Sequence, residues 1–209
     1  MTPLLTHALT VFMAFFAIMN PIANTAAFAG LTGNMDKSQQ VQVATKALII
    51  TFVVIALFSV LGQMIFNLFG ISLPALRITG GILVFLVGYH MLQGSASSMH
   101  SNKDGDTSKA ADNNDIAISP LAVPLLAGPG TIATAMNYST VGGIPAMLTT
   151  ILVFFVLCLI TFVCFIFSAK IIKAIGQNGL NIVTRLMGLI LAVIGTQMLI
   201  AGINGAFHF

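Results

Sequence analysis

Charged side chains are scarce in this sequence, and two residue types are missing altogether. Only 6% of the 209 residues are charged, and the chain contains neither Trp nor Glu. Soluble domains carry about 25% charged residues, so a chain this size with so few cannot cover a water-facing surface. A soluble globular domain is excluded. The five acidic residues all lie outside the long apolar stretches, which also excludes a proton relay through a buried carboxylate.

Side chains with catalytic or metal-binding chemistry are equally sparse. The two cysteines, Cys158 and Cys164, stand six residues apart in one apolar stretch, where they point to different helix faces. The four histidines are dispersed, and the eight basic residues form no patch for nucleic acid. We therefore expect no metal site, no cofactor, no catalytic residue and no enzyme activity.

Apolar stretches dominate what is present. A helix needs about 20 apolar residues to cross the hydrocarbon core of a membrane, and six stretches satisfy this. They cover residues 5–31, 43–69, 74–94, 118–140, 144–168 and 180–205. The sequence predicts an all-α integral membrane protein with six transmembrane helices.

Basic residues indicate how these helices are oriented. Six crossings put both termini on one side of the membrane, and loops on the cytoplasmic side carry the excess of Lys and Arg. The terminal side holds only Arg77. The other side holds Lys37, Lys46, Lys103, Lys109, Lys170 and Lys173, with Arg185 nearby. We predict an inner-membrane protein with both termini outside.

A polar segment separates the two halves of the chain. Residues 95–115 contain four of the five Asp, together with His100, Ser, Asn and Gly. Their spacing matches no calcium-binding loop, and a flexible cytoplasmic linker is the better interpretation. The predicted organisation is a first three-helix unit at residues 1–94, a linker at 95–117 and a second three-helix unit at 118–209.

The two units resemble each other at an offset of about 108 residues. Asn20-Pro21 matches Gly128-Pro129, and the segment Arg77-Ile78-Thr79-Gly80 matches Arg185-Leu186-Met187-Gly188. Because three helices are an odd number, the second unit starts from the opposite side of the membrane. The sequence therefore predicts two inverted three-helix repeats, a plan found in many secondary transporters.

Proline interrupts the first and fourth predicted spans at corresponding places. Pro21 and Pro129 cannot donate a backbone hydrogen bond, and each displaces the carbonyl four residues earlier. Each follows a residue suited to cap a helix, Asn20 or Gly128. We predict that both spans are broken at mid-membrane and that a new half-helix starts at each proline.

Two helix starts that face each other at mid-membrane would form an anion site. Each carries a partial positive charge and unpaired N–H groups, and the freed carbonyls could hold an ammonium group or a cation, so the site suits a zwitterion. The predicted substrate-binding residues are Asn20, Pro21, Asn24, Thr25, Gly128, Pro129, Gly130, Thr131 and Thr134.

Small residues and two arginines mark the third and sixth spans. Each of these spans has small residues on one face. They are Gly80, Gly81 and Gly88 in the third span and Gly188, Ala192 and Gly195 in the sixth. We expect these two faces to pack against the broken helices. Arg77 and Arg185 lie near span ends, where we expect them to extend to the membrane interface rather than contact a ligand.

Two segments resemble the signatures of a known family. Residues 15–24 (FFAIMNPIAN) and 124–132 (PLLAGPGTI) are similar to the paired motifs of the MarC family of bacterial and archaeal membrane proteins, within the larger group of LysE-like exporters. The resemblance covers essentially the whole chain. It implies inverted three-helix repeats and transport of small neutral amino acids such as glycine and alanine.

Three functions remain open at this point. The first is a secondary transporter of small neutral amino acids, whose partners are the lipid bilayer and a small-molecule substrate. A coupling cation, sodium or a proton, is compatible with this function, and so is an oligomer. The second is a channel for water or a small neutral solute, since Asn20-Pro21 is typical of aquaporin half-helices; Gly128 in place of a second Asn argues against it. The third is a membrane enzyme or a structural subunit, which would not need two matched breaks.

Overall fold

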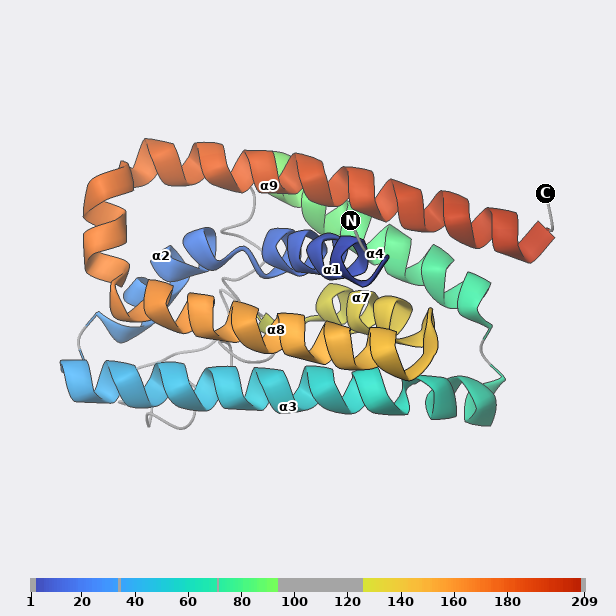
Figure 1. Ribbon diagram of the computed structural model, residues 1–209. Helices are drawn as coiled ribbons and strands as arrows, with labels where there is room; N and C mark the ends of the chain where they lie inside the picture. The colour runs from blue at the N-terminus through green and yellow to red at the C-terminus, as the bar shows by residue number, and fades with distance from the viewer. Residues whose placement is uncertain (1–2, 34, 71, 94–125, 208–209) are drawn as a thin grey trace.

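The computed structural model describes residues 3–33, 35–70, 72–93 and 126–207. This part of the chain is all-helical, with no strand. Most of its helices lie roughly along one common axis, but the first part of α9 runs across the bundle and turns at Gly176, where φ is 68° (Figure 1). They are α1 (Pro3–Met19), α2 (Pro21–Thr32), α3 (Lys37–Phe69), α4 (Leu73–Leu92), α7 (Pro129–Thr140), α8 (Gly143–Ile166) and α9 (Ser168–Phe207).

Five segments of the described residues are long and apolar enough to cross a membrane. They are Leu5–Thr32, Lys37–Gly62, Leu73–Leu92, Gly143–Ile166 and Asn178–Phe207. Each matches a predicted span. Of the predicted fourth span, residues 118–125 lie outside the described residues, as does the predicted linker at 95–117, and α7 forms the remainder.

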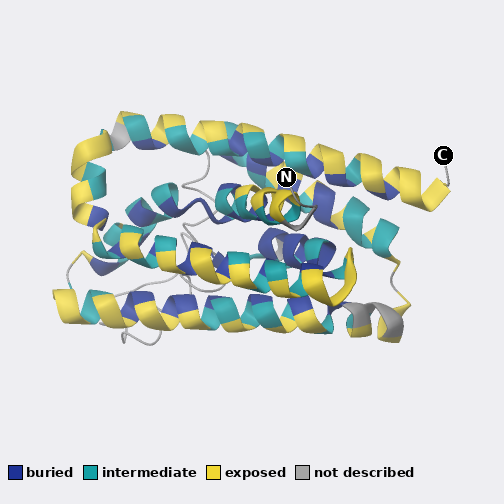
Figure 2. Ribbon diagram, in the orientation of Figure 1, coloured by how far each residue is buried: buried dark blue, intermediate teal, exposed yellow. Residues whose placement is uncertain are grey.

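The outer surface of the bundle is apolar, as a lipid-facing surface must be. Figure 2 shows exposed residues along the outward faces of the long helices and buried residues toward the middle. Val53 of α3, Leu152 of α8 and Ile182 of α9 are all more than half exposed. In water such a surface would drive association, whereas in a bilayer it is matched to the acyl chains.

A buried core holds both halves of the first broken span against α8. Phe15 of α1 packs edge-on against Phe154, with ring centroids 4.8 Å apart, and Phe28 of α2 stacks on Phe165 at 4.5 Å. All four rings are fully buried. Because aromatic rings bury more apolar surface than other side chains, these two pairs fix α1 and α2 along one continuous helix.

Glycines join α4 to α9 along an antiparallel seam. A Cβ added to Gly88 would lie 2.5 Å from the Ala192 backbone N and 2.6 Å from the Gly188 carbonyl O, and one added to Gly195 would lie 2.6 Å from the Gly81 carbonyl O. No real side chain is tolerated at such distances. The small-residue faces were expected to pack against the broken helices, and for these positions that prediction is wrong, because the two faces fit each other.

One glycine of this group does contact a broken helix. A Cβ added to Gly80 would lie 2.9 Å from the Ala133 side chain of α7. The larger pattern is that α7 packs on α4 and α3, while α2 packs on α9 and α8. The α4–α9 seam therefore supports both of the short helices that follow the breaks.

Candidate functional site

The first break is a single residue, Asn20, in the left-handed backbone conformation. Its φ is 38° and its ψ is 69°, and only 3% of its surface is exposed. Asn is one of the few residues other than Gly that adopt this conformation readily. Pro21 follows as the first residue of α2, where its missing N–H is not needed. The predicted break and its cap are confirmed.

Side chains replace the backbone hydrogen bonds that the break removes. The Ala23 N–H donates to Oδ1 of Asn20 at 3.3 Å, and Nδ2 of Asn24 donates to the Met19 carbonyl at 2.6 Å. Thr25 donates its hydroxyl to the Pro21 carbonyl at 2.7 Å. Asn24 and Thr25 were predicted to bind substrate; the structure shows that both also stabilise the backbone around the break.

The second break has a different construction. Leu126 and Ala127 are buried, Gly128 is extended with φ of −66° and ψ of 168°, and α7 starts at Pro129. No side chain caps this helix start, because Gly128 has none to offer. The predicted start of a half-helix at Pro129 is confirmed, and its first-turn N–H groups lack the side-chain acceptor that α2 has.

The structure brings the two breaks toward the middle of the same bundle. Met19, which precedes the first break, and Leu126 and Ala127, which precede the second, belong to one buried cluster. From there α2 and α7 run in opposite directions (Figure 1). Two helix starts thus point toward the middle of the molecule, and their partial positive charges add there.

Unpartnered polar atoms occur at the start of α2 and in the middle of α7. Nδ2 of Asn20 and Oγ1 of Thr134 are buried and make no hydrogen bond within the described part of the chain. Thr134 is fully buried and Thr131 is 3% exposed. A buried polar group without a partner is destabilising by about 1–3 kcal/mol, so two such groups near matched helix breaks are typical of a ligand site rather than of a packed core.

Gly130 gives room at the start of α7. A Cβ placed there would meet only the Val84 side chain, at an ordinary 3.7 Å. Gly130 is buried nonetheless, so a small group could approach the backbone N–H groups of the first turn from this side.

A polar contact that the sequence did not reveal lies farther along α7. Nε of Arg77 on α4 donates to Oδ1 of Asn137 at 2.9 Å. Asn137 is buried and Arg77 half-buried. The expectation that Arg77 extends freely to the interface is therefore wrong, while Arg185 is exposed, as that expectation requires. The available signal was Asn137 itself, a polar residue inside a predicted span.

Comparison with known proteins shows which family the sequence matches. Residues 5–207 match a family model described as "MarC family integral membrane protein". The chain is 39% identical over 201 residues to the "UPF0056 membrane protein YvbG" of Bacillus subtilis (strain 168), covering 94% of each chain. It is 33% identical over 196 residues to the "UPF0056 inner membrane protein MarC" of Escherichia coli (strain SMS-3-5 / SECEC), covering 89% of each. No solved structure matches.

Proposed function

Because the chain belongs to the MarC family of integral membrane proteins, we propose that it is a secondary transporter of small neutral amino acids in the inner membrane. The observation that carries the proposal is the pair of buried, unpartnered polar atoms on Asn20, at the start of α2, and on Thr134, in the middle of α7. These two helices run in opposite directions from the middle of the bundle. Transporters commonly hold a substrate carboxylate at such half-helix starts near the middle of the membrane.

We propose that the substrate carboxylate lies at the start of α7. Its N–H groups have no side-chain cap, and they can bind a carboxylate together with Nδ2 of Asn20. Thr134 and Thr131 supply hydroxyl groups one or two turns into the same helix. The residues of the proposed site are Asn20, Pro21, Asn24, Thr25, Gly128, Pro129, Gly130, Thr131 and Thr134.

The ammonium group of an amino acid needs acceptors rather than donors. The hydroxyl of Thr134, unpartnered as it is, can accept as well as donate. The Met19 carbonyl does not serve this role, because Asn24 already occupies it. A substrate held in this way needs no charged side chain, in agreement with the absence of Asp, Glu, Lys and Arg from residues 3–33 and 126–140.

Contacts within the bundle support an inverted repeat. Gly81 and Gly88 are separated from Gly188 and Gly195 by about 107 residues. A two-fold exchange of these positions converts the Gly81–Gly195 contact into the Gly188–Gly88 contact, and both are present. Helices α2 and α7 also have the same length, 12 residues, and the packing of α2 on α9 and α8 corresponds to that of α7 on α4 and α3.

Basic residues support an orientation with both termini outside. Lys37 and Lys46 lie at the start of α3, and Lys170 and Lys173 at the start of α9. Figure 1 places both of these helix starts at the end of the bundle opposite to the start of α1. Since basic residues favour the cytoplasmic side, that end, with the 95–117 linker, is proposed to be cytoplasmic.

Uptake by purified protein in liposomes tests the function. Radiolabelled glycine or alanine should accumulate above the level of empty vesicles and should saturate, and excess unlabelled alanine should compete while propionate, which lacks the ammonium group, should compete poorly. Sodium and pH gradients applied in turn identify a coupling cation. No uptake under any gradient would refute the proposal, and fast, unsaturable flux of water or glycerol would favour a channel instead.

A further inference from the structure

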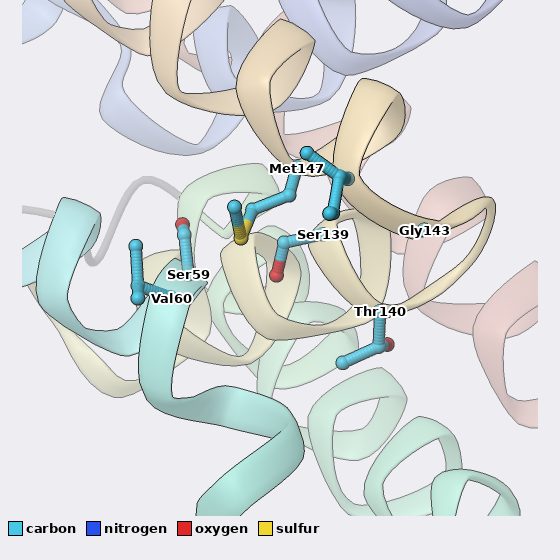
Figure 3. Close-up of a pocket in the computed structure, with 7 residues that line it drawn as sticks. Ser59, Val60, Ser139, Thr140, Gly143 and Met147 are labelled. Atoms are coloured by element: carbon cyan, nitrogen blue, oxygen red, sulfur yellow. The ribbon is translucent and has the colours of Figure 1, made fainter.

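A cavity lies at the far end of α7 from its break. It has a volume of about 210 Å³ and is bounded by α3, the end of α7 and the start of α8 (Figure 3). Its lining residues are Ser59, Val60, Ser139, Thr140, Gly143, Ile144 and Met147. None of them belongs to the site proposed above. Helical rise places Ser139 about 16 Å along the axis from Gly128.

Ser59 gives this cavity a buried polar group without a partner. Its side chain is 3% exposed, and its hydroxyl makes no hydrogen bond within the described residues. The Ser139 hydroxyl across the cavity donates to the Met136 carbonyl at 3.3 Å, so its oxygen can still accept a hydrogen bond. The Thr140 hydroxyl donates to the same carbonyl and points away from Ser59 in Figure 3.

The start of α8 contributes donors to the same space. Gly142 precedes it with a φ of 102°, Gly143 has a φ of 69°, and no side chain caps the helix. The N–H groups of Gly143 and Ile144 belong to the uncapped first turn of a helix of 24 residues, where an anion is stabilised. Both residues line the cavity.

We propose that this cavity is a second binding site for a small zwitterion, with the carboxylate at the first turn of α8 and the ammonium group at the hydroxyl oxygens of Ser59 and Ser139. This inference rests on the proposed function for the class of solute. The volume is below the roughly 300–1,000 Å³ of drug-sized pockets, so only a small solute fits. The cavity opens on the outer face of the bundle, where Val60 and Ile144 are more than half exposed. Together with Met147, these side chains provide apolar contacts for a short side chain.

The position of the cavity gives it a role in the transport path. It lies toward the end of the bundle where α1 begins (Figure 1), the side proposed to face outward. Met147 lies between the Ser59 and Ser139 side chains in Figure 3, and its flexible thioether can change rotamer to admit a solute. A solute that enters from the outside occupies this site before the mid-membrane site, and a solute that leaves to the outside occupies it afterwards.

Protection of introduced cysteines tests the site. In a background in which Cys158 and Cys164 are replaced by Ala, Ser59→Cys and Ser139→Cys are labelled with a small membrane-impermeant thiol reagent in phosphatidylcholine liposomes. Alanine at about ten times its Kd should slow labelling about tenfold, because only unoccupied sites react. Acetate and methylammonium, each half of the zwitterion, should protect less. Asn204→Cys, on the exposed end of α9, should react without protection.

Two further variants separate direct binding from other causes. Adding Thr134→Val, which weakens the mid-membrane site, should leave the protection intact. If protection is lost in this variant, labelling at the cavity depends on occupancy of the mid-membrane site alone, and the proposal is wrong. Adding Ser59→Ala to Ser139→Cys should weaken protection, and this variant also serves if Ser59→Cys does not fold.

The remaining outcomes are equally distinct. Equal labelling rates with and without alanine at both positions would refute the second site, even where uptake succeeds. Protection without any uptake would support the site and refute transport. If added phosphatidylethanolamine protects and alanine does not, the occupant is a lipid headgroup and the proposal is wrong.

Discussion

Helices α2 and α7 have the same length and both begin with a proline, yet they differ at both ends. Asn20 caps α2 with its own side chain, whereas Gly128 leaves the start of α7 open. Near its end α7 carries Asn137, Tyr138 and Ser139, while α2 carries Ala29, Gly30 and Leu31 at the corresponding positions. The two helices are therefore alike in architecture and different in chemistry.

The difference assigns different tasks to the two helices. The end of α7 is fixed by the Arg77–Asn137 hydrogen bond to α4 and by an edge-on contact of Tyr138 with His7 of α1, with centroids 6.0 Å apart. On α2, Gly30 is exposed, and a Cβ there would touch nothing within 4 Å. We infer that the open start of α7 binds the carboxylate, whereas the start of α2 is already capped by Asn20.

The largest expected effect comes from the seam that supports both helices. Gly88→Val would place side-chain atoms against the backbone of α9, and we expect a loss of about 3 kcal/mol or more in stability, seen as loss of folded protein by size-exclusion chromatography in detergent. Gly30→Ala is the matched control and should be silent. A stable Gly88→Val protein would show that the seam is not the common support of α2 and α7.

Converting the start of α7 into that of α2 should have the next largest effect. In Gly128→Asn the new side chain can accept from the first turn, since the backbone there already has the extended conformation of a helix cap. We expect thermal stability to hold or rise and alanine uptake to fall about tenfold or more, equivalent to about 1.4 kcal/mol, because the cap competes with the substrate carboxylate.

The reciprocal change sharpens this test. Asn20→Gly keeps the left-handed conformation, which Gly adopts freely, but removes the cap and the unpartnered Nδ2. Uptake should fall with only a small loss of stability. If Gly128→Asn transports normally, the open start of α7 does not bind the carboxylate.

These breaks were predictable because proline acts locally. The missing N–H of Pro21 and of Pro129 interrupts a helix whatever surrounds it, and the predicted positions agree with the structure. The partner of a helix face is not a local property. A stripe of glycines shows that something approaches closely, but not whether it is a broken helix or, as found, the α4–α9 seam.

The candidate site was predictable in part for the same reason. Asn20, Gly128 and their neighbours follow from the sequence around each proline. The contact of Arg77 with Asn137 joins residues far apart in sequence, and the cavity at Ser59 needs three helices to enclose it. No local pattern encodes either one.

A smaller effect is expected from the unpartnered hydroxyl of α7. Thr134→Val keeps the shape of the side chain and removes a hydroxyl that has no partner among the described residues, so thermal stability should be unchanged or higher. Uptake should fall about fivefold to tenfold, equivalent to about 1–1.4 kcal/mol, the net value of one hydrogen bond. Thr51→Val is the control: that hydroxyl is also buried but donates to the Ala47 carbonyl. Equal uptake in the two variants would remove Thr134 from the site.

The smallest expected effect tests how the end of α7 is held. Arg77→Ala removes the hydrogen bond to Asn137 and leaves this buried amide without a partner, which should lower stability by about 1 kcal/mol. Arg185→Ala, at the matching position of α9, should change little because that side chain is exposed. The melting temperatures of both variants are measured in detergent. Equal shifts for Arg77→Ala and Arg185→Ala would show that the Arg77–Asn137 hydrogen bond does not hold the end of α7.

The joint between α1 and α2 also has a consequence for the membrane around it. In hydrocarbon, a backbone carbonyl that a helix break leaves without a partner is costly. Here Nδ2 of Asn24 on α2 donates to the Met19 carbonyl at the end of α1, and Oδ1 of Asn20 accepts from the Ala23 N–H. The chain therefore closes its own backbone hydrogen bonds at the break with two uncharged amide side chains.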